Sequence, residues 1–470
     1  MKIFSDKFTR AIVLCCAFML PIAVSAEQQS DEITDDGALI LEHADQNENF
    51  YSSATGEFIS HLRGNVVFRF EDLRISSDEA RWQRSAGIVN FSRNVRAEQR
   101  GQLLTCERLH FVRDNNLLTA TRNVVYQDSA RITTIRGHTA EYMTNTKEAV
   151  LHGNPLLTRF DSSSDTDTTF LRGRKITYND STKIATVIDN VNIRRGELTA
   201  TGQIGYYFAN TNTAQLRVNP IIHYETHKIV GDSVDLVFND EALESAFVVG
   251  NTHGIYREAA DTTADTTVTN IWSDRMHMYM FESGKVRSIK AFGNARGNHA
   301  NAPNDSIGNT MSTDISSDSL HVFMFEENGK IRAIRAYGNA HGRNAEWSPA
   351  SETDTSITHI WGDSLRISMT DEGRMRLMRA FGNAQSKNFV VGDSARANEV
   401  SGQIMTLIFN NNGKIERAVV TGNAKSLYHL EEGEGGGSNN ATGDQIIVMF
   451  RNGRAQKLQV RGNVKGFYSP

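Results

Sequence analysis

Apolar and polar residues alternate along many short segments of the chain, which is the pattern of a β-strand with one buried face. Leu320-His-Val-Phe-Met324 and Leu365-Arg-Ile-Ser-Met369 are two clear examples. No segment keeps a sustained apolar period of 3.6 residues, and the chain of 470 residues contains only six prolines. The pattern therefore predicts a protein that is almost entirely β.

A turn signal follows the clearest strands. These signals are Glu282-Ser-Gly-Lys285, Glu327-Asn-Gly-Lys330, Asp371-Glu-Gly-Arg374, Asn411-Asn-Gly-Lys414 and Arg451-Asn-Gly-Arg454. Gly, often with Asn before it, supplies the positive φ angles that tight hairpins need. Each repeat is therefore predicted to be a strand, a hairpin and a returning strand. The returning strands, such as Ile331–Tyr337, break the alternation, and the pattern assigns no face to them.

A Gly-Asn pair or a degenerate copy of it follows the returning strands. The twelve asparagines are Asn65, Asn94, Asn123, Asn154, Asn190, Asn219, Asn251, Asn294, Asn339, Asn383, Asn423 and Asn463, spaced by 29 to 36 residues up to Asn251 and by 40 to 45 afterwards. Gly and Asn both tolerate the left-handed region, so a bend or bulge is expected at each pair. About twelve strand–hairpin–strand repeats would stack into an elongated array on the order of 115 Å long.

A third mark, an Asp followed by alternating apolar residues, lies between the asparagines. Gly231-Asp-Ser-Val234 and Ser317-Asp-Ser-Leu320 are examples. If the marked strands pair in register, their apolar residues line up as one apolar wall. One early strand extends the same kind of face. Where the wall is rich in Met, its surface is flexible. The wall consists of Val66, Phe68, Phe70, Val234, Leu236, Phe238, Met276, Met278, Met280, Leu320, Val322, Met324, Leu365, Ile367, Met369, Ile446, Val448 and Phe450.

This combination of Asp mark, hairpin and Gly-Asn pair, repeated over about residues 40–470, resembles the OstA-like proteins. That family includes LptA and the N-terminal domain of LptD. The resemblance implies an elongated open β-jellyroll whose slot shields the acyl chains of lipopolysaccharide. It implies a lipid-binding bridge that carries this lipid from the inner to the outer membrane, with the apolar wall as the lipid-binding surface.

The resemblance also implies partners. Besides lipopolysaccharide, these are other OstA-like transport components at both edges of the stack, namely LptC-like inner-membrane and LptD-like outer-membrane proteins. A stack of strands with bare edges tends to aggregate unless a partner covers it, so head-to-tail self-association is a further expectation.

The N-terminus predicts export. Lys2, Lys7 and Arg10 precede an apolar run over residues 11–24, and Val24-Ser-Ala26 offers small residues for cleavage, so residues 1–26 are predicted to be a secretory signal peptide. A retained anchor is the weaker interpretation because the run is short. The predicted location is the periplasm. The expected organisation is a polar tail at 27–39, short-period repeats at 40–250 and repeats with longer loops at 251–470.

Charge and cysteine content narrow the function further. The 50 Lys and Arg residues against 55 Asp and Glu residues give a net charge of −5, which provides no basic field for nucleic acid. Cleavage after Ala26 would leave Cys106 as the one remaining cysteine, so no intramolecular disulfide is expected. No cofactor is predicted.

Candidate reaction chemistry is sparse. Three acidic runs, Asp161–Asp167, Asp261–Asp265 and Glu352–Asp354, could offer oxygen ligands to Ca²⁺, but they lack the Gly and closing Glu of a calcium loop, so solvated loops are favoured. His277 and His321 repeat at one strand position, and surface histidines are favoured over a shared metal. The chain shows no G-x-S-x-G, H-E-x-x-H or P-loop motif, so no catalytic residue or metal ligand is predicted.

Two other function classes fit the same pattern. The first is a structural or adhesive β-repeat protein whose apolar wall is simply a filled core, since apolar alternation mostly marks core. The second, less favoured, is a polysaccharide-acting enzyme that pairs carboxylates across the repeats of a β-solenoid. A filled core predicts no lipid uptake, whereas an enzyme predicts carbohydrate turnover that depends on particular carboxylates.

Overall fold

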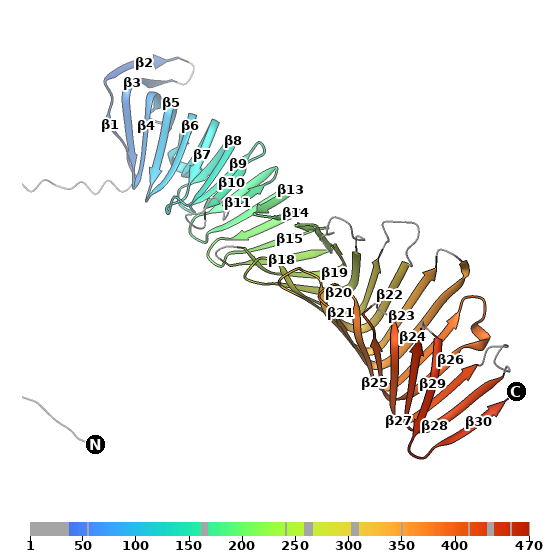
Figure 1. The fold of residues 1–470 in the computed structure, drawn as a ribbon. Coiled ribbons are helices and arrows are strands. Elements are labelled where there is room, and N and C mark those ends of the chain that lie inside the picture. The colour runs from blue at the N-terminus through green and yellow to red at the C-terminus, as the bar shows by residue number, and fades with distance from the viewer. Residues whose placement is uncertain are drawn as a thin grey trace, which may run out of the picture.

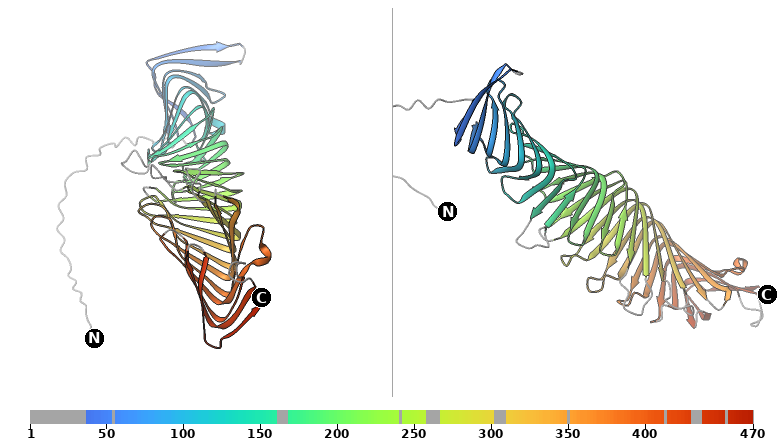
Figure 2. Two further views of the ribbon diagram at one scale, coloured as in Figure 1. Left: turned by 45° about the vertical axis from the view of Figure 1, so that its right-hand side comes forward. Right: turned by 90° about the horizontal axis from the view of Figure 1, so that it is seen from above.

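A computed structural model describes the chain at residues 37–53, 56–160, 168–239, 242–257, 267–301, 310–348, 351–411, 414–429, 437–451 and 454–469. These residues form an elongated, twisted stack that runs from the N-terminal strands to the C-terminal strands (Figure 1). The strands lie across the long axis of the stack, as the two further views show (Figure 2). The predicted signal peptide at 1–26 lies outside the described residues, as do most of the expected polar tail and the acidic runs at 161–167 and 261–265.

Thirty strands and two short 3₁₀ helices make up the described chain. The first fifteen strands are β1 (Leu39–His43), β2 (Gln46–Ser52), β3 (Glu57–Phe70), β4 (Leu73–Gln83), β5 (Ile88–Gln99), β6 (Gln102–Val112), β7 (Leu117–Gln127), β8 (Thr133–Met143), β9 (Glu148–His152), β10 (Leu156–Phe160), β11 (Thr168–Arg172), β12 (Lys175–Asn179), β13 (Ile184–Arg195), β14 (Leu198–Phe208) and β15 (Thr213–Arg217), with η1 (Arg113–Asn115) between β6 and β7. All pair as antiparallel neighbours in one sheet.

The remaining strands continue the same sheet. They are β16 (Ile221–Tyr224), β17 (His227–Val230), β18 (Ser233–Phe238), β19 (Leu243–Arg257), β20 (Thr267–Met280), β21 (Val286–Asn301), β22 (Thr310–Met324), β23 (Ile331–Ser348), β24 (Ser351–Met369), β25 (Met375–Val390), β26 (Asn398–Phe409), β27 (Ile415–His429), β28 (Ser438–Arg451), β29 (Arg454–Arg461) and β30 (Lys465–Ser469), with η3 (Ser394–Arg396) between β25 and β26. The prediction of an elongated all-β fold is confirmed.

Each long strand is folded at a corner, so the single sheet forms two facing layers. In the pair β20–β21, Arg275–Met280 pairs with Val286–Phe292 on the side of the hairpin turn, and residues 267–272 pair with residues 296–301 beyond a register shift. We call these two sides the hairpin layer and the loop layer. In several earlier repeats the corner divides the strand completely, as between β15 and β16, so the count is thirty strands rather than twenty-four.

The corners lie at the predicted asparagines. All twelve have a positive φ, between 45° and 56°, as the left-handed tolerance of Asn requires. The residue before each asparagine also has a positive φ. The expectation of a bend at each Gly-Asn pair is therefore confirmed.

The corners also show why the Asp mark recurs. The side-chain amide of Asn294 donates to Asp274 at 3.1 Å, and that of Asn251 donates to Asp232 at 3.1 Å. The glycine before the asparagine is needed for space as well as for φ, because a Cβ on Gly293 would lie 2.3 Å from an oxygen of Asp274. The same bond joins Asn65 to Asp45, so Asp45 belongs to a copy of the mark that sequence analysis missed.

A second bulge explains the broken alternation of the returning strands. Beyond the β22–β23 hairpin, Met324 pairs with Ile331 but Phe323 pairs with Ala333, so one residue is extra in the returning strand. The bulge turns Ile331, Ile334 and Ala336 to the interior, where all three are buried. The pattern could not assign these faces because the bulge shifts the alternation by one residue.

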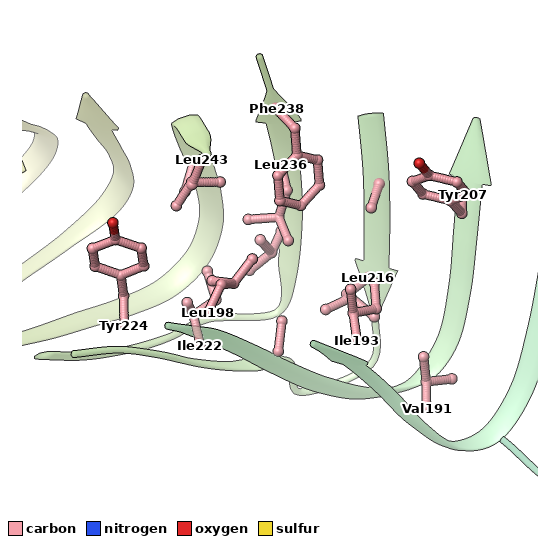
Figure 3. Close-up of a cluster of buried hydrophobic side chains, with 14 of the residues drawn as sticks. Val191, Ile193, Leu198, Tyr207, Leu216, Ile222, Tyr224, Leu236, Phe238 and Leu243 are labelled. Carbon is pink, nitrogen blue, oxygen red and sulfur yellow. The ribbon is translucent and has the colours of Figure 1, made fainter. Parts of the chain in front are cut away.

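One continuous cluster of buried side chains fills the interior from β1 to β28. Figure 3 shows a part of it, where Ile193 and Leu198 of the loop layer and Leu216 and Leu236 of the hairpin layer enter the same space. The cluster crosses residue 251 without a break, and β19 spans that position. A division of the repeats at 251 stays a prediction.

The described residues contain no α-helix. Within the same ranges, the structure has no helix that is long and apolar enough to cross a membrane.

Candidate functional site

The predicted apolar wall lies in the interior of the stack. Met276, Met278 and Met280 are at most 5% exposed, and Met369 is 9% exposed. Phe450 is the one wall residue that is only partly buried. Fifteen of the eighteen wall residues follow an Asp mark, and they stand side by side in the hairpin layer because the pairing register aligns the marks.

The early strand departs from the expected arrangement. Val66, Phe68 and Phe70 belong to the loop layer, because they follow the corner at Asn65 and pair with residues 73–77 of β4. They are buried and face the wall instead of extending it, since the Phe68 ring meets that of Phe91 at 5.4 Å from the opposite layer. Alternation alone could not separate the two layers, because both present an apolar inner face.

Small residues of the loop layer stand opposite the wall in the C-terminal part of the stack. A Cβ on Gly254 would lie 3.2 Å from the sulfur of Met276, and one on Gly297 would lie 2.9 Å from Leu320. Gly342 has the same relation to Leu365, at 3.3 Å. The wall side chains therefore contact bare backbone at these glycines, and a larger residue there would require the Met or Leu side chain opposite to move.

Aromatic rings fill the corresponding space in the N-terminal part. The Phe70 ring lies 5.4 Å from that of Phe111, and the Tyr126 ring lies about 6 Å from those of Tyr142 and Tyr178. Tyr126, Tyr178 and Phe111 are at most 1% exposed. These rings come from both layers, so this part of the interior is packed across its full width.

A buried polar cluster joins the two layers at the side away from the corners. Gln102, at the start of β6 in the loop layer, donates at 2.7 Å to Asp180, which follows β12 in the hairpin layer. The hydroxyl of Ser129 and the ammonium of Lys183 donate to the same carboxylate at 3.1 Å and 2.6 Å. Tyr142 donates to Gln99 at 3.0 Å and also to Gln102. This set of bonds fastens the layers together.

The surroundings fix the charge states in this cluster. Burial alone would raise the pKa of the Asp180 carboxyl, but hydrogen bonds from Lys183 and Gln102 outweigh it, so the pKa lies below its ordinary value. Burial raises the pKa of Tyr126 and of Tyr142 well above the usual range, and the charge of Asp180 adds to the effect. Lys183 also lies 3.8 Å from the buried carboxylate of Asp128, so one lysine and several neutral donors hold two carboxylates, and this arrangement holds the two layers together.

Two tyrosines make similar links further along the stack. Tyr224 of β16 donates to the carbonyl oxygen of Gly284, and Tyr256 of β19 donates to that of Gly329. Both glycines are hairpin turns with positive φ, which confirms the turn prediction there. Each bond connects an end of the loop layer to a hairpin turn of the other layer, 60 or 73 residues away.

Polar side chains line the inner face of the loop layer next to its loops. Thr269 bonds to His299 at 2.8 Å, Thr313 to Asn344 at 3.0 Å and Asn388 to Thr358 at 2.8 Å. Each pair is a cross-strand neighbour on the same face as the buried isoleucines. Burial lowers the pKa of His299 to about 4, so its ring is neutral at pH 7. The interior is thus apolar at the corners and polar, but uncharged, at the loops.

The histidines and the cysteine noted in the sequence form no metal site or reactive site in the described part of the chain. His277 and His321 lie on the outer face of the hairpin layer with Lys290 between them in the register, which disfavours a shared cation. Cys106 is buried, and burial raises the pKa of its thiol to about 12. In the described part of the chain, no three His, Cys, Asp or Glu side chains gather closely enough to hold a metal ion. The side chains of the run at 352–354 lie outside the described set.

Aromatic side chains are exposed at both terminal pairs of strands. Tyr51 and Phe58, on β2 and β3, are 60% and 62% exposed. Phe467 and Tyr468, on β30, are 65% and 50% exposed. Single exposed apolar residues are ordinary, but two such groups at the two ends of the stack mark candidate contact surfaces.

Sequence analysis missed the residues that fasten the layers. Gln102 and Asp180 are 78 residues apart and belong to no repeated mark, so the sequence carries no signal that pairs them. Tyr224 and Tyr256 could have been found, because each lies five residues beyond a corner asparagine.

Comparison with known proteins agrees with this architecture. The family model of OstA-like proteins matches residues 81–232. One similar solved structure is that of LptH, described as the LptA homologous periplasmic component of the conserved lipopolysaccharide transport device from Pseudomonas aeruginosa, with 16% identity and a TM-score of 0.15 over 29% of this chain and 75% of that chain. No curated protein matches. The family match confirms the resemblance over residues 81–232, which form an OstA-like segment of this chain.

Proposed function

We propose that this protein carries lipopolysaccharide through the periplasm from the inner to the outer membrane, with the acyl chains held between the hairpin and loop layers. The observation that carries the proposal is the single apolar interior, which continues from Leu39 to Val448 along an elongated stack. Residues 1–26 are the signal peptide in this proposal. It involves no catalytic step and no cofactor.

The energetics favour holding a lipid while letting it move. Burial of hydrocarbon contributes about 0.8 kcal/mol per CH₂, so a few methylene groups per repeat retain the lipid. Successive repeats present similar apolar rows, such as Met276 to Met280 and Leu320 to Met324, so no repeat binds an acyl chain much more tightly than its neighbours. Because the wall now packs against the loop layer, an acyl chain would enter by replacing contacts between the layers. The part lined by Met and Gly is best suited to this exchange.

The terminal strands are the proposed contact surfaces for partners. The outermost strands of the described sheet are β1 and β2 at one end and β29 and β30 at the other, and β2 and β30 carry exposed aromatic residues. A strand of an LptC-like protein at one end and of an LptD-like protein at the other would continue the sheet by β-augmentation. A second copy of the chain could make the same head-to-tail contact.

One observation favours a second candidate, a structural β-repeat protein with a filled core. In the N-terminal part the rings of Phe70 and Phe111 touch across the interior, and the Asp180 cluster ties the layers together. A lipid would have to displace both. The two candidates therefore differ in whether lipid reaches the interior at all.

Photo-crosslinking decides between them. The full chain is produced in a bacterium that makes lipopolysaccharide, with a benzophenone side chain at Met369, which is buried, or at Ser368, its outward neighbour in β24. The proposal expects a lipopolysaccharide adduct at Met369 and none at Ser368, together with bound lipid in native mass spectra. A folded protein with no adduct at either position and no bound lipid would refute it and favour the filled core.

A further inference from the structure

The outer face of the loop layer changes character near residue 253. Residues that pair across neighbouring strands lie on one face of a sheet, so the register defines rows that run along the stack. One outer row passes through His253, Trp272, Arg296, Ser316, His341 and Trp361. The row beside it passes through Asn270, Asn298, Asp314, Arg343, His359 and Lys387.

Between Thr105 and Val230 the same outer row has no ring, and its one ring before His253 is that of His43 at the N-terminal end of the described stack. The ringless part of the row reads Thr105, Val125, Arg136, Leu156, Arg172, Asn192, Thr201, Ile221 and Val230. The backbone plan is unchanged between the two parts, so packing of the stack does not require the rings and amides that appear from His253 onward. These residues call for a different explanation.

A hollow of ≈ 630 Å³ lies over these rows. It spans β19 to β23 and is lined by side chains that include Trp272, Arg296, Asn298, Asp314 and His341. The Trp272 side chain is 39% exposed. The volume is in the range of small-ligand sites, which combine a flat apolar surface with a few fixed polar groups.

The aromatic walls of the hollow are held in place by further rings. The Trp272 ring is stacked on that of His253 at 4.8 Å with an interplanar angle of 10°. The His341 ring is stacked on those of His359 and Trp361 at 5.2 Å and 5.1 Å. Trp272 and His341 lie three strands apart, on the order of 14 Å. Two rings of fixed orientation thus border the hollow from opposite ends.

The polar groups between the rings are also fixed. The Asp314 carboxylate accepts from Asn298 at 2.6 Å and from Arg343 at 3.1 Å. The lining carries one arginine, Arg296, against two carboxylates, Asp274 and Asp314, so the hollow offers no net positive charge to an anionic ligand. Planar amide, carboxylate and guanidinium groups donate and accept paired hydrogen bonds, which suits vicinal hydroxyl groups, and the two carboxylates of the lining disfavour phosphate.

We propose that this hollow is a binding site for a linear, uncharged carbohydrate chain of the cell envelope, distinct from the carried lipid. Its placement in the envelope rests on the proposed periplasmic function. Rings of fixed orientation offer apolar faces to sugar rings, and the fixed polar groups bind the hydroxyls. The rows run along the stack, so an extended chain follows them over several repeats.

The position of the hollow separates this ligand from the lipid. Trp272 and Arg296 point outward, whereas their neighbours Ile271 and Ala295 are buried in the interior, so the sheet itself stands between the two sites. A protein partner is disfavoured because protein hot spots need a dry apolar centre. Here Arg296, Asn298 and Asp314 occupy the centre.

Binding of chitohexaose, a linear and uncharged chain of β-1,4-linked N-acetylglucosamine that represents the sugar backbone of peptidoglycan, tests the proposal. The full chain is titrated by calorimetry and by tryptophan fluorescence. We expect saturable binding, with Kd raised at least tenfold in Trp272→Ala and in Arg296→Ala. Arg172→Ala is the matched control, because Arg172 occupies the same outer row before His253 and should bind as the wild type does. Arg296 and Arg172 are exposed, so these two variants should keep the unfolding midpoint of the wild type, and Arg296→Ala decides the outcome if loss of the Trp272–His253 stacking lowers the midpoint of Trp272→Ala.

Several outcomes would overturn the proposal. These are no binding by the wild type at millimolar glycan, equal binding in all variants, or loss of binding in Arg172→Ala alone. Binding of lipid-free core oligosaccharide but not of chitohexaose would assign the hollow to the carried lipid and would also overturn it. Lipid content, measured by native mass spectrometry on the same samples, reports separately on the proposed function.

Discussion

The repeats before and after residue 251 share one backbone plan but fill the space between their layers differently. In the earlier repeats the space holds rings such as Phe111 and Tyr126, which meet rings of other strands. In the later repeats it holds methionines such as Met276 and Met278, and the opposite layer offers glycine, as at Gly254. The earlier interior is fixed by ring contacts and hydrogen bonds, whereas flexible side chains fill the later one.

This difference bears on how an acyl chain could move. A methionine side chain changes rotamer easily and adapts to an irregular neighbour, so a lipid that enters the later repeats displaces little fixed structure. The earlier repeats would have to separate stacked rings and the bonds of Asp180. If the whole stack conducts lipid, the earlier repeats are expected to be its most restrictive part.

Removal of the Asp180 carboxylate should give the largest effect on stability. Asp180→Ala leaves Lys183 and Gln102 without their shared acceptor, and loss of one partner of a buried charged pair costs about 3 kcal/mol or more. We expect the earlier repeats to unfold at markedly lower denaturant concentration, with amide exchange of β6 and β12 accelerated. The measurement is denaturant unfolding followed by hydrogen exchange.

Asp274→Ala is the matched control in the later repeats. That carboxylate is exposed and bonded to Asn294 at a corner, so its removal should cost about 1 kcal/mol or less. If the two variants lose the same free energy of unfolding, then hydrogen bonds between the layers do not stabilise the earlier repeats more than the later ones.

Much of the repeat plan was predictable because it depends on local backbone chemistry. The twelve corner asparagines could be read from the sequence, since a positive φ selects Asn and Gly wherever it occurs. The hairpins at Gly284, Gly329 and Gly373 follow the same rule. Burial of the Met276 to Met280 row followed from alternation. These features involve residues close together in the chain.

Other features depend on distance and register, which one sequence does not provide. Val66 was expected to extend the wall but lies in the facing layer, because both layers present apolar inner faces. Asp180 and Gln102 meet across 78 residues without any shared motif. The outer row through Trp272 and His341 exists only once the strand register is known. The bulge after each hairpin from β18–β19 onward shifts this register in a way the alternation conceals.

Acid pH should have the next largest effect. Lowering the pH from 6.5 to 4 should reduce the free energy of unfolding of the later repeats, around His299, by about 3 kcal/mol. Burial lowers the pKa of His299 to about 4, so its protonation costs stability as the pH falls from 6.5 to 4. The pKa of Asp180 is lowered, so its contribution is lost only as the pH falls below 3.8. At pH 4.5 we therefore expect exchange protection to fall around β20 and β21 while β6 and β12 stay protected.

His299→Asn tests the assignment of that acid response. The variant keeps a polar partner for Thr269 but removes the titrating ring, so the stability of β20 and β21 should become nearly flat between pH 6.5 and 4.5. If the wild-type profile persists in the variant, another group is responsible, and His227 is the next to test because burial lowers its pKa to about 4 as well.

The corners offer the smallest and most local comparison. Every corner from Asn251 onward has Gly before the asparagine, whereas some earlier corners have Arg, Asp or Val there. Val218 has a φ of 66°, which is unfavourable for a β-branched side chain by roughly 1 kcal/mol or more. The Val218 side chain is 49% exposed, so little packing is lost on its removal. Val218→Gly should therefore raise the free energy of unfolding by about 1 kcal/mol.

Gly293→Val is the reciprocal change in the later repeats and should be destabilising. It places a β-branched residue at a φ of 76°, and the added Cβ would lie 2.3 Å from the carboxylate of Asp274, so the Asp274–Asn294 bond must shift as well. Denaturant unfolding of both variants, compared with the wild type, measures the two effects in one experiment. Opposite signs would establish that the earlier corners tolerate strain that the later corners avoid by using glycine. A destabilised Val218→Gly variant would instead mean that the Val218 side chain makes a favourable contact that outweighs its backbone strain.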